Sequence, residues 1–287
     1  ELPQRGRPAV ITASRTTWVL STALAAIVLS EALGAFGNNI SGSIASGLVL
    51  EGLLIGCVLA ARRSAGGRVL PPLSAALLVL ALIPLARLAS FSVPSHELPR
   101  STWPGVVGVV LLVGAWRIAP LVGQSSLQSR LRLPVPADAL LVAGAVPVGL
   151  LLFGSIGTKD ARLPHGALAI AAAVAVVAFA ALAEEIAYRG VLLDALTRAR
   201  LSGAPSRLRI ETAGANIIAS AAYAAACLGW PMPYPLIAFV AALVLGRTAQ
   251  HRRSVTGVAI AHIVAWSVAL FVAPALFGAS ASGFLLW

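Results

Sequence analysis

Long runs of apolar residues separated by short polar connections dominate this sequence. A helix needs about 20 apolar residues to cross the hydrocarbon core of a bilayer, and the runs have about that length. Only helices and closed barrels satisfy their backbone groups in lipid, so the pattern predicts an all-α, polytopic membrane protein. We place nine spans, at residues 16–36, 43–61, 70–92, 103–123, 138–157, 165–188, 211–229, 234–250 and 256–277.

The longest break between spans covers residues 124–137 and contains Pro134 and Pro136. It predicts a linker between an N-terminal four-span unit, residues 1–123, and a C-terminal five-span core, residues 138–287. The sixth apolar run continues past its predicted end as an amphipathic stretch, GVLLDALTRAR.

The first apolar run follows three arginines, Arg5, Arg7 and Arg15, as the core of a signal peptide would. Residues 16–36 are longer than a typical signal-peptide core, so we interpret the run as a retained first span.

Composition supports the membrane assignment. The 287 residues are 59% hydrophobic and 11% charged, and the mean hydropathy is +0.91. Cys57 and Cys227 both lie inside apolar runs, which does not indicate a disulfide framework. The sequence has no CxxC pair and no Cys/His cluster of the zinc-binding kind, so we predict neither a cofactor nor a metal site.

The net charge of +11 reflects membrane orientation. With the N-terminus in the cytoplasm, 16 of the 21 Lys and Arg residues fall in segments on the inner side, as the positive-inside rule requires. Nine spans then place the C-terminus outside. No dense basic cluster alternates with exposed aromatic residues, so nucleic acid is not a predicted partner. The predicted surroundings are the lipid bilayer and a membrane-associated peptide or a partner membrane protein.

The stretch AEEIAYRG places charged residues at the end of the sixth run. Glu185 and Arg189 are four residues apart and share a helix face, so they are expected to form an ion pair. Glu184 points about 100° away and is free to meet water or substrate, with Tyr188 one turn below it. A free carboxylate of this kind is a candidate general base. The alternative is that these residues only mark the cytoplasmic end of the span.

Two further acids, Glu31 and Glu51, lie inside the first two spans. Intramembrane acids are functional candidates by default, because a charge in lipid is costly. They are expected either to line a polar cleft, to bind a partner helix, or to take part in an ordinary interhelical hydrogen bond.

The segment EEIAYRG followed by VLLDAL resembles the first motif, Glu-Glu-x-x-x-Arg, of the CAAX-protease and bacteriocin-processing (CPBP, or Abi) family. The resemblance extends over about residues 135–275. The segment SAAYAAACLGW, residues 220–230, is similar to the second motif, Phe-x-x-x-His, and residues 246–266 are similar to the third, with His262 in the histidine position. The family consists of multi-span intramembrane endopeptidases, so the resemblance implies a plasma-membrane protein of a bacterium.

The resemblance implies a role for each matching position. Glu184 corresponds to the glutamate that activates water, and His262 to a histidine that stabilises the oxyanion. The chain differs from the family at three positions: Tyr223 replaces Phe, Cys227 replaces the second-motif His, and Trp266 replaces Asn or Asp. A thiol is a poor substitute for imidazole as a proton carrier, and an indole donates one hydrogen bond but accepts none.

The predicted span ends place these residues at different depths. Glu184 and His262 fall near cytoplasmic ends, whereas Cys227 falls near the opposite end of its span, about 20 Å away at 1.5 Å per residue. Either the helix that carries Cys227 starts deeper than drawn, or Cys227 lies outside the site.

Three functions are compatible with the sequence. The first is a CPBP-type endopeptidase in which Glu184 activates water, Glu185 and Arg189 brace the helix, and His262 polarises the carbonyl. The second is a catalytically silent relative that binds or scaffolds a membrane partner, favoured by Cys227 and Trp266. The third is a transporter or channel subunit, and the lack of inverted repeats counts against it.

Overall fold

In the computed structural model of the chain, the described residues are 8–36, 39–62, 70–92, 103–121, 131, 136, 138–156, 166–198, 208–228 and 230–277. Within these ranges the long segments are helical, and no strand occurs. The predicted all-α class is therefore confirmed. The linker predicted at residues 124–137 lies almost entirely outside the described residues, and the division into two units stays a prediction.

The helices of the N-terminal half are α1 (Pro8–Phe36), α2 (Asn39–Arg62), α3 (Pro72–Leu80), α4 (Leu82–Ser92) and α5 (Trp103–Leu121). Those of the C-terminal half are α6 (Asp138–Ile156), α7 (Ala167–Glu185), η3 (Ile186–Leu192), α8 (Leu193–Arg198), α9 (Leu208–Ala226), α10 (Tyr234–Arg252), α11 (Thr256–Ser267), η4 (Val268–Val272) and α12 (Ala273–Phe277).

Several of these elements join end to end, so the described residues form nine continuous helical segments, one for each predicted span. Six are long and apolar enough to cross a membrane, and α5 and α9 contain shorter apolar stretches. The prediction of a polytopic helical membrane protein is confirmed. Which side each loop faces stays a prediction.

The third segment is interrupted at Ala81, between α3 and α4. Pro84 lies in the first turn of α4 and has no N–H to bond the carbonyl of Leu80, which loosens the helix at this point. Backbone hydrogen bonds from Ala81 to Leu77 and from Leu85 to Ala81 continue on either side, at 3.0 and 3.2 Å. The interruption is therefore local, and the span predicted at residues 70–92 is retained.

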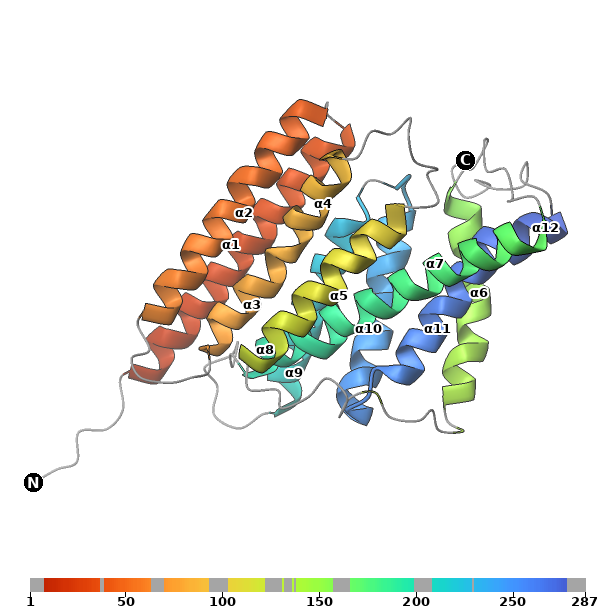
Figure 1. Cartoon of the computed structure of the whole chain (residues 1–287). Helices are drawn as coiled ribbons and strands as arrows, with labels where there is room; N and C mark the ends of the chain where they lie inside the picture. The colour runs from red at the N-terminus through yellow and green to blue at the C-terminus, as the bar shows by residue number, and fades with distance from the viewer. Residues whose placement is uncertain are drawn as a thin grey trace, which may run out of the picture.

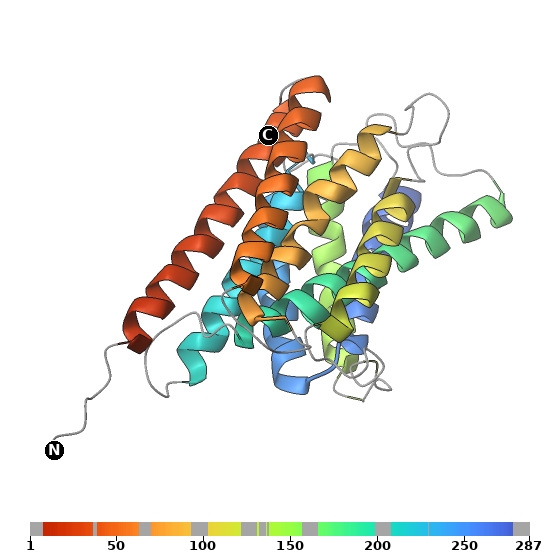
Figure 2. The ribbon, with the colours of Figure 1, turned by 60° about the vertical axis from the view of Figure 1, so that its left-hand side comes forward.

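The helices are arranged as two groups in contact. In Figure 1, α1, α2 and the α3–α4 segment lie side by side at one end of the molecule, while α6 and α11 lie toward the other. The turned view in Figure 2 keeps α1 and α2 beside each other and away from α7. Contacts of α5 with α7, of α1 with α9, and of α3 with α8 join the groups.

The segment from α7 through η3 to α8 is longer than a membrane is thick. It forms one apolar stretch of 32 residues, Ala167–Arg198. At 1.5 Å per residue it is about 48 Å long, against about 30 Å for the hydrocarbon core, so it either lies inclined in a bilayer or extends beyond it. In Figures 1 and 2 this segment runs obliquely across the bundle.

Helices α6 and α11 pack closely because small residues face each other. A Cβ atom at Gly149 would lie 2.6 Å from the carbonyl oxygen of Ala265, so only glycine permits this approach. At the other end of α6, Asp138 packs against Gly257 and forms an ion pair with Arg252 of α10. Small residues generally allow such close packing between membrane helices, and here they place α11 firmly against α6.

Candidate active site

The charged motif lies where an α-helix changes into a π-helix. Glu184 and Glu185 are the last two residues of α7, and Arg189 lies within η3, all seven residues of which are buried. A π-helical segment widens the turn and often occurs at functional sites. Because the helix continues through η3 and α8 to Arg198, Glu184 lies in the middle of a long helix. The helix therefore continues through the predicted amphipathic stretch, and the membrane boundary placed at residue 188 stays a prediction.

Glu185 connects α7 to α11. Its side chain is fully buried, and its Oε1 lies 3.1 Å from a guanidinium nitrogen of Arg189 and 2.8 Å from Nδ1 of His262. The ion pair with Arg189 that the spacing predicted is present. The contact with His262 was not predicted, since it joins residues 77 positions apart. The carboxylate thus compensates the buried arginine and orients the histidine at the same time.

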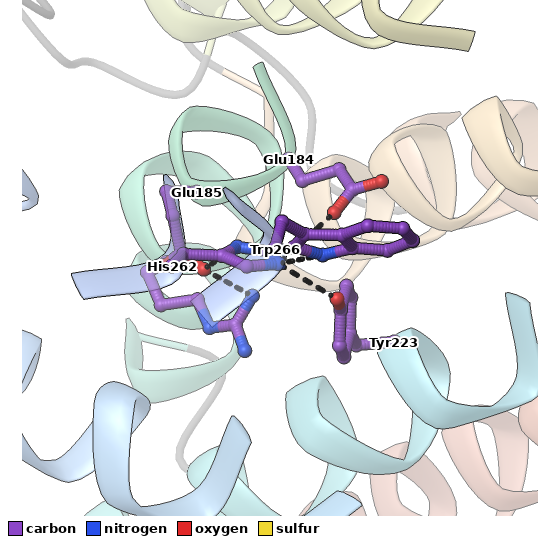
Figure 3. Close-up of polar contacts among 6 residues, drawn as sticks. Glu184, Glu185, Tyr223, His262 and Trp266 are labelled. Atoms are coloured by element: carbon purple, nitrogen blue, oxygen red, sulfur yellow. Dashed lines mark hydrogen bonds and ion pairs between the residues drawn. The ribbon is translucent and has the colours of Figure 1, made fainter. Parts of the chain in front are cut away.

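His262 is held through both ring nitrogens. Nδ1 faces Glu185, while Nε2 lies 2.7 Å from the indole nitrogen of Trp266 and 3.0 Å from the hydroxyl of Tyr223. An indole N–H only donates, so Nε2 is the acceptor and carries no proton in this arrangement. The proton is therefore on Nδ1, which donates to Glu185. Figure 3 shows the imidazole between the carboxylate and the indole ring.

Glu184 faces away from Glu185, toward Tyr223 and the indole of Trp266 (Figure 3). Its Oε2 lies 3.7 Å from Nε2 of His262, too far for a hydrogen bond but within the span that one water bridges. This oxygen is buried and has no hydrogen-bond partner among the described residues. The side chain is 20% exposed, against 6% for His262. Glu184 is thus the acid that the protein leaves available.

Tyr223 is the residue through which α9 takes part in the site. Besides its contact with His262, its hydroxyl lies near the carboxylate of Glu184 and the thiol of Cys227. The guanidinium of Arg189 lies 4.7 Å from the centre of the Tyr223 ring. One phenol therefore contacts side chains from all three motifs.

Cys227 belongs to the cluster. It is buried, it lies directly after the last residue of α9, and it is four residues from Tyr223. The separation of about 20 Å inferred from the predicted span ends is wrong, because Glu184 lies well inside its helix and not at the end. The ring of Tyr188 packs edge-on against Tyr223, with ring centres 5.4 Å apart, so this residue supports the site through packing.

Aromatic side chains complete one wall of the site. Trp266 packs against Trp230 and Tyr234, with ring centres 5.7 and 6.0 Å apart, and Trp230 stacks on Tyr234 at 5.3 Å. Neither Trp230 nor Tyr234 was predicted as a site residue. They follow the second motif closely in the chain, and this proximity was the available signal.

An apolar cavity of about 570 Å³ adjoins the cluster. It lies between α6, α10 and α11, and its walls are almost entirely aliphatic. Its polar end is formed by Tyr223, Tyr234, His262 and Trp266. The arrangement places a lipid-like space directly beside His262.

The two N-terminal acids differ from each other. Glu31 is buried and pairs with Arg87 of α4, with a guanidinium nitrogen 2.7 Å from its Oε2. Glu51 is exposed on α2, at a distance from the cluster around His262. Among the described residues, no group of three or more His, Cys, Asp or Glu side chains is arranged to hold a metal ion.

The comparison with protein families agrees with this arrangement. Residues 166–268 match the family model described as type II CAAX prenyl endopeptidase, Rce1-like. The C-terminal half carries an Rce1-like domain. The matched residues include Glu184, Glu185, Tyr223, His262 and Trp266, and the predicted resemblance to the CPBP family is confirmed at the level of the family. Comparisons with curated proteins and with solved structures gave no match.

Proposed function

We propose that the chain is an intramembrane endopeptidase of the CPBP type, with Glu184 as the base that activates water. The observation that carries this proposal is a carboxylate oxygen of Glu184 that has no hydrogen-bond partner among the described residues. It lies 3.7 Å from Nε2 of His262, and His262 itself lines the apolar cavity. A base has to be within reach of the water it deprotonates, directly or through one intervening molecule. Of the two adjacent acids, only Glu184 meets this condition.

The proposed reaction is hydrolysis of a peptide bond. The water oxygen attacks the scissile carbonyl carbon while Glu184 accepts one proton, and the same carboxyl group then delivers that proton to the leaving amine. Glu185 and Arg189 are positioning residues, since they act on the reaction by holding His262. The charge that develops on the carbonyl oxygen requires a hydrogen-bond donor, which His262 supplies in this proposal.

The indole of Trp266 determines whether His262 can donate this hydrogen bond to the carbonyl oxygen. While the indole N–H donates to Nε2, that nitrogen is an acceptor and cannot stabilise an oxyanion. In the active form the indole moves away and Nε2 gains a proton. The described arrangement is therefore the resting form of the proposed enzyme.

The cavity supports a substrate with an apolar part. Its aliphatic walls suit a lipid chain or an apolar peptide segment, and its polar end adjoins the proposed catalytic groups. The matching family is described as acting on CAAX prenyl proteins, and a prenylated C-terminal peptide is accordingly the first substrate class to test.

A catalytically silent relative is the second candidate. It is favoured by the indole that covers Nε2 of His262 and by the thiol of Cys227 in the position of the family's second histidine. Such a protein would use the same cavity to bind a membrane partner without cleaving it.

The deciding experiment is cleavage of a prenylated peptide by the purified protein in lipid, with the unprenylated peptide as the matched control. Glu184→Gln keeps the size of the side chain but cannot take the proton, so cleavage should fall at least about 100-fold. Glu51→Gln makes the same change at an exposed acid outside the cluster and should leave the rate within a few-fold of the parent.

The double variant Cys227→His, Trp266→Asn separates the two candidates. It restores the family's groups and should raise the rate if the site is a weakened endopeptidase. Unchanged cleavage in Glu184→Gln would exclude this residue as the base. A parent and a double variant that both bind the peptide without cleaving it would support the silent relative.

A further inference from the structure

Glu51 is an acid on the outer surface of a membrane helix. It is the twelfth of the 22 residues of the apolar span Ile40–Ala61, about 16 Å from either end. Among the described acidic residues of the six membrane-capable segments, only Glu51 is exposed. Glu31, on the neighbouring helix, is by contrast buried and forms an ion pair with Arg87.

The residues around Glu51 form one continuous face. Ile44, Gly47, Glu51, Ile55 and Val58 follow one another at intervals of three or four residues, so they lie along one side of α2. The three apolar members are each at least half exposed, at 59, 52 and 50%. A Cβ atom at Gly47 would meet nothing within 4 Å. We call this the Glu51 face.

We propose that the Glu51 face is the interface with a second copy of this chain. A carboxyl group at this depth costs several kcal/mol if it faces only lipid, so intramembrane acids almost always face a partner. A protonated carboxylic acid both donates and accepts a hydrogen bond, so two such groups can hydrogen-bond each other. A twofold axis along the membrane normal brings the same residue of two copies together at the same depth.

Two features of the face fit a second copy. The spacing of three and four residues is that of packed helix pairs, and Gly47 lies one turn from Glu51, where it lets two backbones approach closely. Helix α2, which carries the face, also lies at the end of the molecule away from α6 and α11, so a dimer through it leaves the cavity beside His262 open (Figure 1). A different protein would have to carry a matching polar group at the same depth.

The first test is disulfide crosslinking of the full chain in phosphatidylcholine vesicles, in a Cys57→Ala background. Ile55→Cys should form a covalent dimer on oxidation. Val113→Cys is the matched control, because Val113 is 54% exposed on α5, outside the Glu51 face. Crosslinking of Ile55→Cys no faster than that of Val113→Cys would overturn the proposal.

The second test measures the dimer dissociation constant by single-molecule subunit counting as the protein is diluted in lipid. Glu51→Leu should raise this constant about five-fold or more, as expected for loss of an interhelical hydrogen bond. Glu51→Gln, which still donates and accepts, should stay within about two-fold. Gly47→Leu should raise the constant by blocking the close approach.

Three results would contradict a second copy at this face. A parent chain that is monomeric at every dilution excludes the dimer. A dimer that keeps its dissociation constant in both Glu51→Leu and Gly47→Leu uses another surface. A different membrane protein that co-purifies in equal amount and crosslinks to Ile55→Cys shows that the face belongs to a heterologous partner.

Discussion

Glu185→Gln should destabilise the protein strongly, although it changes only one oxygen to an amide nitrogen. The Glu185 side chain is fully buried and compensates Arg189, whose side chain is 2% exposed. Breaking a buried ion pair by neutralising one partner typically costs about 3–5 kcal/mol, because the remaining charge stays in a poorly solvated place. The oriented hydrogen bond from His262 adds to this cost.

The loss should be measured as the free energy of unfolding in mixed detergent micelles, with the melting temperature as a second readout. Glu184→Gln is the matched control, since it makes the same change on the adjacent residue. Glu184 is partly exposed and lies farther from its neighbours, so Glu184→Gln should lower the free energy of unfolding by about 1 kcal/mol or less. Glu185→Gln combined with Arg189→Met removes both charges and should recover part of the loss, because paired removal is often nearly neutral.

The reasoning fails if Glu185→Gln is as stable as the parent. It also fails if Glu184→Gln destabilises the protein as much as Glu185→Gln does. If Glu185→Gln and the double variant are equally stable, the single variant does not leave an uncompensated charge on Arg189. The ion pair would then have no structural role.

Three further predictions concern other parts of the molecule. Gly149→Leu should lower the melting temperature by several degrees, because its Cβ would lie 2.6 Å from the carbonyl oxygen of Ala265, whereas the exposed Gly144→Leu should not. Arg87→Met should destabilise the protein by about 3 kcal/mol in a denaturant titration, and adding Glu31→Gln should restore most of it, since the buried acid then needs no partner. A topology reporter at the C-terminus should be on the opposite side from one placed beside Arg63, and the same side for both would contradict the orientation inferred from the basic residues.

The helices were predictable because apolar runs of membrane length have few alternative structures. The Glu185–Arg189 pair was predictable for a similar reason, since a spacing of four residues on a helix fixes proximity. Both inferences use only neighbours in the chain.

Other parts of the site depend on contacts between distant segments. The charges of the first motif were placed near the cytoplasmic end of the sixth span, because sequence alone does not show that Glu185 has a partner on α11. The same holds for Trp266: its exchange for Asn or Asp is visible in the sequence, but its bond to Nε2 of His262 requires the relative placement of two ring systems. The π-helical form of η3 has no sequence signal that we can identify.

Because the segment Ala167–Arg198 runs obliquely across the bundle (Figures 1 and 2), the geometry of the site is expected to depend on the thickness of the bilayer. A helix of fixed length fits a thinner membrane by inclining further and a thicker one by standing more upright. Glu184 lies near the middle of this segment and His262 on another helix, so a change of tilt alters the separation between them. We therefore expect lipid composition to alter the geometry of the two groups without binding to either.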